Sequence, residues 1–168
     1  MSAYRDHFVT FARYNAWANT RLYDACAALP ESEYHAARPA AFFGSLHGTL
    51  NHILVGDRAW MRRITGEGAA PDSLDAELYP TLTELRAARV AEDDRIRTFA
   101  ESLDEAGLTR VVSYHSMTGG ADARPIAELL GHLFNHHTHH RGQAHALLSA
   151  AGAKPPPLDM IYFLRDSG

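Results

Sequence analysis

Apolar residues recur at intervals of three and four along most of the chain. Between residues 3 and 29 they alternate regularly in this way. The apolar members of the stripe are Tyr4, Phe8, Phe11, Ala18, Leu22, Ala25 and Leu29. This spacing is typical of the buried face of an α-helix, and Pro30 is expected to end it. Asn15 lies in the same stripe, and a buried amide needs hydrogen-bond partners, so Asn15 is either a structural hub or part of a site.

A second helix is predicted over residues 45–66. Ser45 is suited to cap its N-terminus, and Gly66 to end it. Its main stripe consists of Leu46, Leu50, Ile53, Leu54, Asp57, Met61 and Ile64. His52 lies off this stripe, between Gly48 and Gly56 at four-residue spacing. A histidine with such small neighbours has open space around it, which suits a cavity or a close approach of another helix.

A third helix is predicted over residues 81–103, where Thr81 and Glu84 have the spacing of a capping box. Its buried face is formed by Leu82, Leu85, Ile96, Phe99 and Leu103. The acidic residues 92–94 are expected to face solvent. Residues 67–79, rich in Gly, Pro, Asp and Ser, are predicted to form the preceding loop.

The pattern changes over residues 109–124, where β-branched residues precede a Thr-Gly-Gly-Ala-Asp turn. This stretch predicts a strand and a small β-hairpin. A fourth long helix follows over residues 125–151, with Pro125 at its first position and Gly152 at its end. The apolar tail after Pro157 is expected to pack back on the helices.

Four amphipathic helices with short connections favour an all-α fold, a four-helix bundle with a possible small β-hairpin before the last helix. The length of 168 residues indicates a single domain, residues 1–168. Bundles of this kind build metal and cofactor sites from side chains on facing helices.

Composition excludes several classes of function. The net charge is −4, so we expect no nucleic-acid partner. No apolar run is long enough to cross a membrane, and the first residues do not resemble a secretion signal. The single cysteine, Cys26, cannot form an intrachain disulfide and is expected to be a small core residue. These features together predict a cytoplasmic protein.

The histidines carry the candidate chemistry. The chain has 11 of them, and five lie within residues 132–140. His136 and His140 are four residues apart, so their side chains share one helix face and can converge on one metal ion. His52 is the natural third ligand from another helix, and three histidines with an open position describe a catalytic zinc site. Imidazole also suits nickel, copper and iron.

The spacing alone leaves other assignments open. The pairs 132/136, 136/139 and 137/140 are also helical neighbours. Buried histidines can also be hydrogen-bonded core residues without any metal.

Four segments resemble the DinB family of helical-bundle metalloproteins. Residues 131–143, GHLFNHHTHHRGQ, resemble the family's H-x-x-N-H-x-x-H-H-R-G-Q signature. Residues 50–60 (LNHILVGDRAW), 14–19 (YNAWAN) and 152–159 (GAKPPPLD) resemble its other conserved stretches, in family order. The resemblance therefore covers most of the chain and implies the DinB type of bundle.

This resemblance implies that the metal ligands are His52, His136 and His140, and leaves His137 without a special role. It also implies one divalent ion per chain, zinc or nickel, and a homodimer. Members of the family resemble metal-dependent hydrolases and thiol-dependent S-transferases, which points to a small-molecule substrate and a low-molecular-weight thiol as cosubstrate. They are distinct from the lesion-bypass DNA polymerase of similar name.

Residues around the candidate site have less defined roles, and the sequence assigns no catalytic residue. Asn135, Arg141 and Gln143 flank the histidines, and Gln143 could orient a ligand or contact a substrate. Arg141 is expected to pair with a carboxylate, and Asp57, in an apolar stripe, needs such a partner. Asp57 as a general base is the less favoured alternative.

Three hypotheses follow. The first is a metal-dependent thiol S-transferase or hydrolase, with an open coordination position and a pocket at the end of the bundle. The second is a non-catalytic, metal-binding stress-response protein whose site is closed. The third is a structural bundle whose histidines bind no metal.

Overall fold

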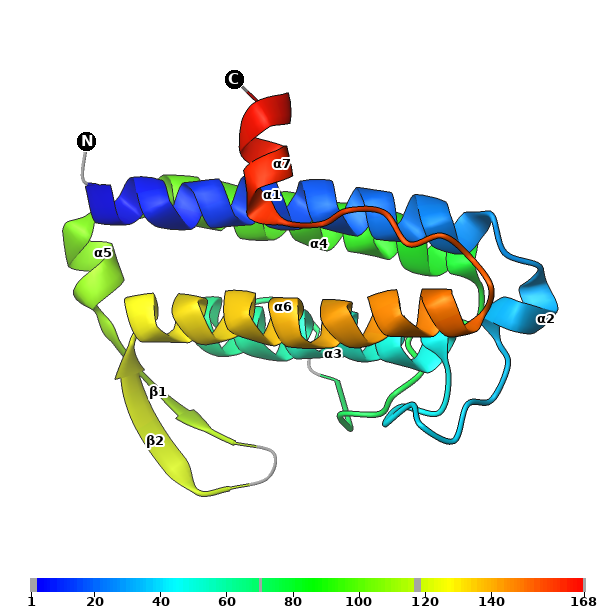
Figure 1. Ribbon diagram of the computed structural model, residues 1–168. Coiled ribbons are helices and arrows are strands. Elements are labelled where there is room, and N and C mark those ends of the chain that lie inside the picture. The colour runs from blue at the N-terminus through cyan, green and yellow to red at the C-terminus, as the bar shows by residue number, and fades with distance from the viewer. Residues whose placement is uncertain (1–2, 70, 117–118, 168) are drawn as a thin grey trace.

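The computed structural model describes residues 3–69, 71–116 and 119–167. Its long helices form two layers (Figure 1). One layer contains α1 (Ala3–Ala27) and α4 (Leu82–Ser102), and the other contains α3 (Leu46–Thr65) and α6 (Ile126–Ala150). Helix α1 also contacts α6, and α3 contacts α4, so the two layers close into a bundle. The predicted all-α bundle is confirmed.

The ends of the long helices follow local sequence signals. The Ser45 side chain accepts a hydrogen bond from the Gly48 N–H, and Gly66 ends α3 with φ of 80°. Thr81 caps α4 as predicted by accepting from the Glu84 N–H, but the Glu84 carboxylate accepts from the Thr81 hydroxyl, where a capping box has the backbone N–H of the cap residue as donor. Pro125 differs from its prediction, because it lies just before the first helical residue of α6 and ends a strand instead.

The predicted hairpin is present. Strands β1 (Val111–His115) and β2 (Ala121–Pro125) pair antiparallel, with Val111 opposite Pro125 and His115 opposite Ala121. Figure 1 shows the hairpin projecting beside the layer of α3 and α6.

Three short helices were not predicted, because four to seven residues give too few apolar repeats for a periodic pattern. They are α2 (Glu31–Tyr34), α5 (Glu105–Thr109) and α7 (Met160–Asp166). In α7, Phe163 is buried and its ring lies 5.9 Å from the rings of both Tyr14 and Trp17. The tail therefore packs back on the bundle as expected.

The core includes Cys26, whose side chain is buried as predicted and unpaired as a free thiol. Burial raises the pKa of this thiol to about 12, so it stays protonated and unreactive at neutral pH. In the described ranges, no helix carries an apolar stretch that could span a membrane.

The expectation that residues 92–94 face solvent is wrong for Glu92 and Asp93. These two residues are only 6% and 7% exposed, while Asp94 is exposed. Asp93 lies 3.0 Å from the Arg89 guanidinium and accepts a hydrogen bond from Asn19. An inward-facing arginine on the same helix therefore draws the carboxylate into the core.

The expected pairing of Asp57 with Arg141 is also wrong. Asp57 binds the Arg89 guanidinium and accepts a hydrogen bond from His137 Nε2 at 2.6 Å. Arg141 instead donates to Asn15 Oδ1 at 2.6 Å. Both pairings depend on which helices pack against each other, because Arg89 lies on α4 and Asn15 lies on α1. Asn15 is thereby shown to be a structural hub.

Candidate metal centre

The structure brings His52, His136 and His140 together between α3 and α6. The Nε2 atom of His52 lies 3.2 Å from the Nε2 atoms of both His136 and His140. One ligand nitrogen from each of the three lies within 4.8 Å of the others, the arrangement needed to hold one metal ion. The other members of the alternative pairs, His132, His137 and His139, do not belong to this cluster.

Two of the three imidazoles are oriented through their other ring nitrogen. His52 Nδ1 donates to the Leu74 carbonyl oxygen at 2.7 Å, and His140 Nδ1 donates to Gln143 Oε1 at 2.8 Å. Because both partner oxygens only accept, each Nδ1 carries the proton and each Nε2 presents a lone pair. Gln143 thus supports the candidate ligand His140, as its position in the sequence suggested.

Two lone pairs and a third ring nitrogen facing one another at this distance fit a cation. Two nitrogens bound at about 2.0–2.1 Å in a tetrahedral site lie roughly 3.3–3.4 Å apart. The observed 3.2 Å separations are close to that value. The donor set, the tautomers and the spacing therefore all suit a divalent metal ion.

Burial and mutual repulsion keep these imidazoles neutral. Desolvation, followed by the charges of the neighbouring histidines, lowers the pKa of His136 to about 3. Desolvation also lowers the pKa of His140 to about 4 and the pKa of His52 below its usual value. Since only the neutral imidazole binds a metal, all three are ready as ligands at pH 7.

The two glycines beside His52 leave room for other groups. A Cβ on Gly56 would lie 2.6 Å from Cε1 of His136, so this glycine admits the His136 ring. A Cβ on Gly48 would lie 2.1 Å from the carbonyl oxygen of Phe43, so that glycine admits the loop before α3. The Phe43 ring then stacks on His52, with ring centroids 3.7 Å apart. Phe43 covers one face of the cluster, and no sequence signal had indicated it.

A cavity of about 290 Å³ adjoins His52 and His136. Its other lining residues are Gly56, Ala59, Trp60, Arg63, Leu74, Ser116 and His132. The pocket was expected at the end of the bundle. The observed cavity lies elsewhere, because it adjoins His136, which lies near the middle of α6. The cavity shows that the cluster is reachable from one side rather than closed.

One further expectation is corrected at the site, and the less favoured alternative of Asp57 as a base is removed. His137 has a role after all, because its ring is fully buried and donates to Asp57 in the core. Asp57 has both carboxylate oxygens engaged, by His137 and Arg89, which removes it as a candidate base.

Asn135 is exposed and faces away from the core. The Leu74 carbonyl was missed because a backbone group in a loop leaves no residue-type signal.

The comparisons of this sequence and of this fold with known proteins agree with one another. The model of the DinB family matches residues 1–166. Protein DinB of Bacillus subtilis (strain 168) is 27% identical over 157 residues, which are 90% of each chain. The crystal structure of a DinB-like protein from Bacillus cereus ATCC 10987 matches with a TM-score of 0.59 and 18% identity, over 84% of this chain and 90% of the other. At that identity the structural match supports the fold alone.

Proposed function

The chain belongs to the DinB family, and from this premise we propose that it is a metal-dependent enzyme. Family and histidine cluster together fit a metal-binding DinB-like protein. The ligands in this proposal are His52, His136 and His140, and the ion is one zinc or nickel per chain. The observation that carries the proposal is the convergence of three Nε2 atoms beside an accessible cavity.

The proposed reaction is transfer to or from a low-molecular-weight thiol, with hydrolysis as the second candidate. A divalent ion in this site would supply a Lewis acid that lowers the pKa of a thiol or a water molecule. The chain's own groups orient and shield the reacting atoms. Leu74 and Gln143 fix two imidazole rings, and Phe43 keeps water from one face of His52.

The lining of the cavity favours the thiol reaction. Among the described residues, none of the side chains that line it is a carboxylate. A thiolate attacks without further proton removal, whereas hydrolysis usually also needs a general base or acid near the reacting atoms. The described lining offers no carboxylate for that task, and its one imidazole outside the proposed ligand set is that of His132, so a sulfur nucleophile is the simpler assignment.

Metal content is the decisive test. Untagged protein, purified without nickel resin, is expected to contain about one ion per chain by mass spectrometry. H52A and H136A are expected to lose the ion, and H139A, an exposed histidine one residue from His140, is expected to keep it. A wild type that stays metal-free after reconstitution with zinc and nickel contradicts the proposal.

Turnover is tested next on the loaded protein. Cysteine and glutathione are offered with monobromobimane or 1-chloro-2,4-dinitrobenzene as electrophile. Thiol consumption that requires the metal supports an S-transferase. A stoichiometric metal without turnover of any thiol or ester supports the non-catalytic alternative instead.

We also propose that the protein is a homodimer. The apolar side chains of Ile161 and Leu164 on α7 are about half exposed, which a partner subunit could cover. Light scattering of the purified protein measures the mass directly, and a monomer at micromolar concentration contradicts this part of the proposal.

A further inference from the structure

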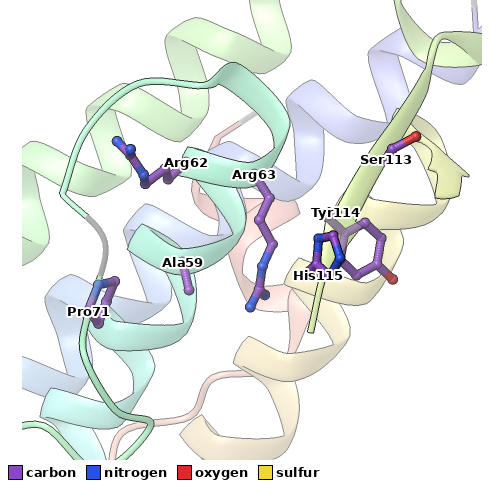
Figure 2. A pocket seen from close by; sticks show the side chains of 7 residues that line it. All are labelled: Ala59, Arg62, Arg63, Pro71, Ser113, Tyr114 and His115. Carbon is purple, nitrogen blue, oxygen red and sulfur yellow. The ribbon is translucent and has the colours of Figure 1, made fainter. Parts of the chain in front are cut away.

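A second cavity of about 290 Å³ lies between the last turns of α3 and strand β1 (Figure 2). It is lined by Ala59, Arg62, Arg63, Pro71, Ser113, Tyr114 and His115. Ala59 and Arg63 also line the cavity beside the histidine cluster. The two cavities therefore meet at Arg63.

The guanidinium of Arg63 lacks an anionic partner. Within the described ranges, no carboxylate lies at ion-pairing distance from it. Its neighbours are aromatic instead, with the Trp60 ring centroid at 4.6 Å and the Tyr114 ring centroid at 5.8 Å. The side chain is half-buried, and desolvation lowers the pKa of its guanidinium, although an arginine stays charged at neutral pH. The N–H donors of this guanidinium are therefore free of an anionic partner in the described part of the chain and can bind a ligand.

The neighbouring Arg62 provides a contrast on the same helix. Its side chain is exposed and donates to the Gly68 carbonyl oxygen at 2.6 Å. Figure 2 shows Arg63 extending into the space between Ala59 and β1, while Arg62 points to the other side. The two arginines carry the same charge but only Arg63 reaches into both cavities.

The surroundings of Arg63 favour negative charge. His115 lines the second cavity and His132 lines the first, so each adds a possible hydrogen-bond donor. Asp122 of β2 contacts the other side of Tyr114, where it accepts from the Tyr114 hydroxyl at 3.3 Å and from Arg124 at 3.1 Å. Because Arg124 compensates that charge, Asp122 does not neutralise Arg63.

We propose that Arg63 binds a carboxylate or phosphate group of a small substrate whose reactive end lies beside His52 and His136. A planar guanidinium matches either anion with two parallel hydrogen bonds. Each cavity alone is at the lower limit of ligand pockets, about 300–1,000 Å³, so a ligand spanning both fits that range better. This inference names the substrate class of the proposed reaction, and it therefore rests on the proposed function.

The anion site is tested first without any catalytic readout. The chain has two tryptophans, and only Trp60 contacts Arg63, while Trp17 binds Asp166 on α7. The indole N–H signals in an ¹H–¹⁵N spectrum therefore provide a reporter and an internal control. Succinate and inorganic phosphate are titrated into the protein as purified and after EDTA treatment, with neutral succinamide as the matched probe.

We expect succinate or phosphate to shift the Trp60 signal saturably in both preparations, with Trp17 unmoved and succinamide without effect. R63Q is expected to weaken this binding at least tenfold, R63K to retain part of it, and R62Q to leave it unchanged. A wild type whose Trp60 signal does not move overturns the inference. A folded R63Q protein that binds like wild type overturns it equally.

A second measurement connects the anion to the metal centre. Cobalt-loaded protein is titrated with 3-mercaptopropionate and with 2-mercaptoethanol, which differ in the carboxylate, and binding is followed by the sulfur-to-cobalt absorption band. We expect about tenfold tighter binding of the carboxylate-bearing thiol in wild type and R62Q, and no preference in R63Q. Equal binding of both thiols in wild type contradicts the placement of the anion.

The two proposals fail in different ways. Protein that binds succinate through Arg63 but never holds a metal rejects the metal-dependent function and keeps the anion site. Protein that holds the metal at the three histidines but gives no Arg63-dependent response rejects this inference alone.

Discussion

Asp57 on α3 and His137 on α6 are joined by a 2.6 Å hydrogen bond, between Oδ1 and Nε2, in the centre of the bundle. Both side chains are almost completely buried, and the other oxygen of Asp57 binds Arg89 of α4. Three helices are therefore held by one carboxylate. His137 directly follows His136 in the chain, so this contact also fixes the rotation of α6 at the candidate metal centre.

Replacing Asp57 by Asn is expected to destabilise the fold strongly. The substitution leaves the buried Arg89 without its full counter-charge, and breaking a buried pair in this way costs about 3–5 kcal/mol. Urea unfolding followed by circular dichroism measures the loss. D94N is the matched control, because Asp94 is exposed and pairs with Arg97 at the surface, where a pair contributes about 0–1 kcal/mol. Similar losses in both variants contradict the assigned role of Asp57.

The metal-free protein is expected to lose stability as the pH falls below 6.5. The folded-state pKa values of His136 and His140 are lowered to about 3 and about 4, from 6.5. Between these values the unfolded chain binds protons that the folded chain does not, so acid favours unfolding. Above pH 6.5 these imidazoles are neutral in both states and have no effect, and the destabilisation grows as the pH falls to about 4 for His140 and about 3 for His136.

Thermal melting of EDTA-treated protein at pH 7.5 and pH 5.0 measures this effect. H136Q is expected to reduce the difference between the two melting temperatures, because it removes one of the groups that is protonated only on unfolding. A wild-type difference no larger than that of H136Q contradicts the assignment.

The parts of the fold that follow from neighbouring residues were predictable. Ser45 and Thr81 cap helices through contacts three residues away, and the alternating apolar pattern placed the long helices within about two residues of their observed ends. Short elements such as α5 were not predicted, because a single turn depends on what it packs against.

The candidate site was predictable only in part. Four-residue spacing put His136 and His140 on one face, but several pairs shared that property, and family resemblance selected among them. The inward rotation of His137 and Asp93 could not be predicted, because it depends on partners from other helices, Asp57 and Asn19. The Leu74 carbonyl is positioned by the path of a loop, which residue types alone do not specify.

Gln143 is expected to tune metal affinity without contacting the metal. Its side-chain oxygen holds the Nδ1 proton of His140, and removing such a partner typically weakens metal binding about 10–100-fold. Q143L is expected to show this loss, measured by zinc competition with a chromophoric chelator. Q143E keeps an acceptor oxygen and is expected to bind nearly as tightly as wild type. Equal affinity of Q143L and wild type contradicts the role.

Gly56 is expected to be required for the metal centre, although it has no side chain to contribute. An alanine there would place its Cβ 2.6 Å from Cε1 of His136, so the imidazole must rotate away from His52. We expect G56A to weaken zinc binding at least tenfold in the same competition assay. G131A is the control, because Gly131 lies on α6 with open space where a Cβ would be. Alanine favours a helix over glycine by about 0.5–1 kcal/mol, so G131A should be slightly more stable and keep full affinity. If G56A binds zinc as tightly as G131A, His136 is not held against α3 in the way described, and the three-histidine centre loses its geometric support.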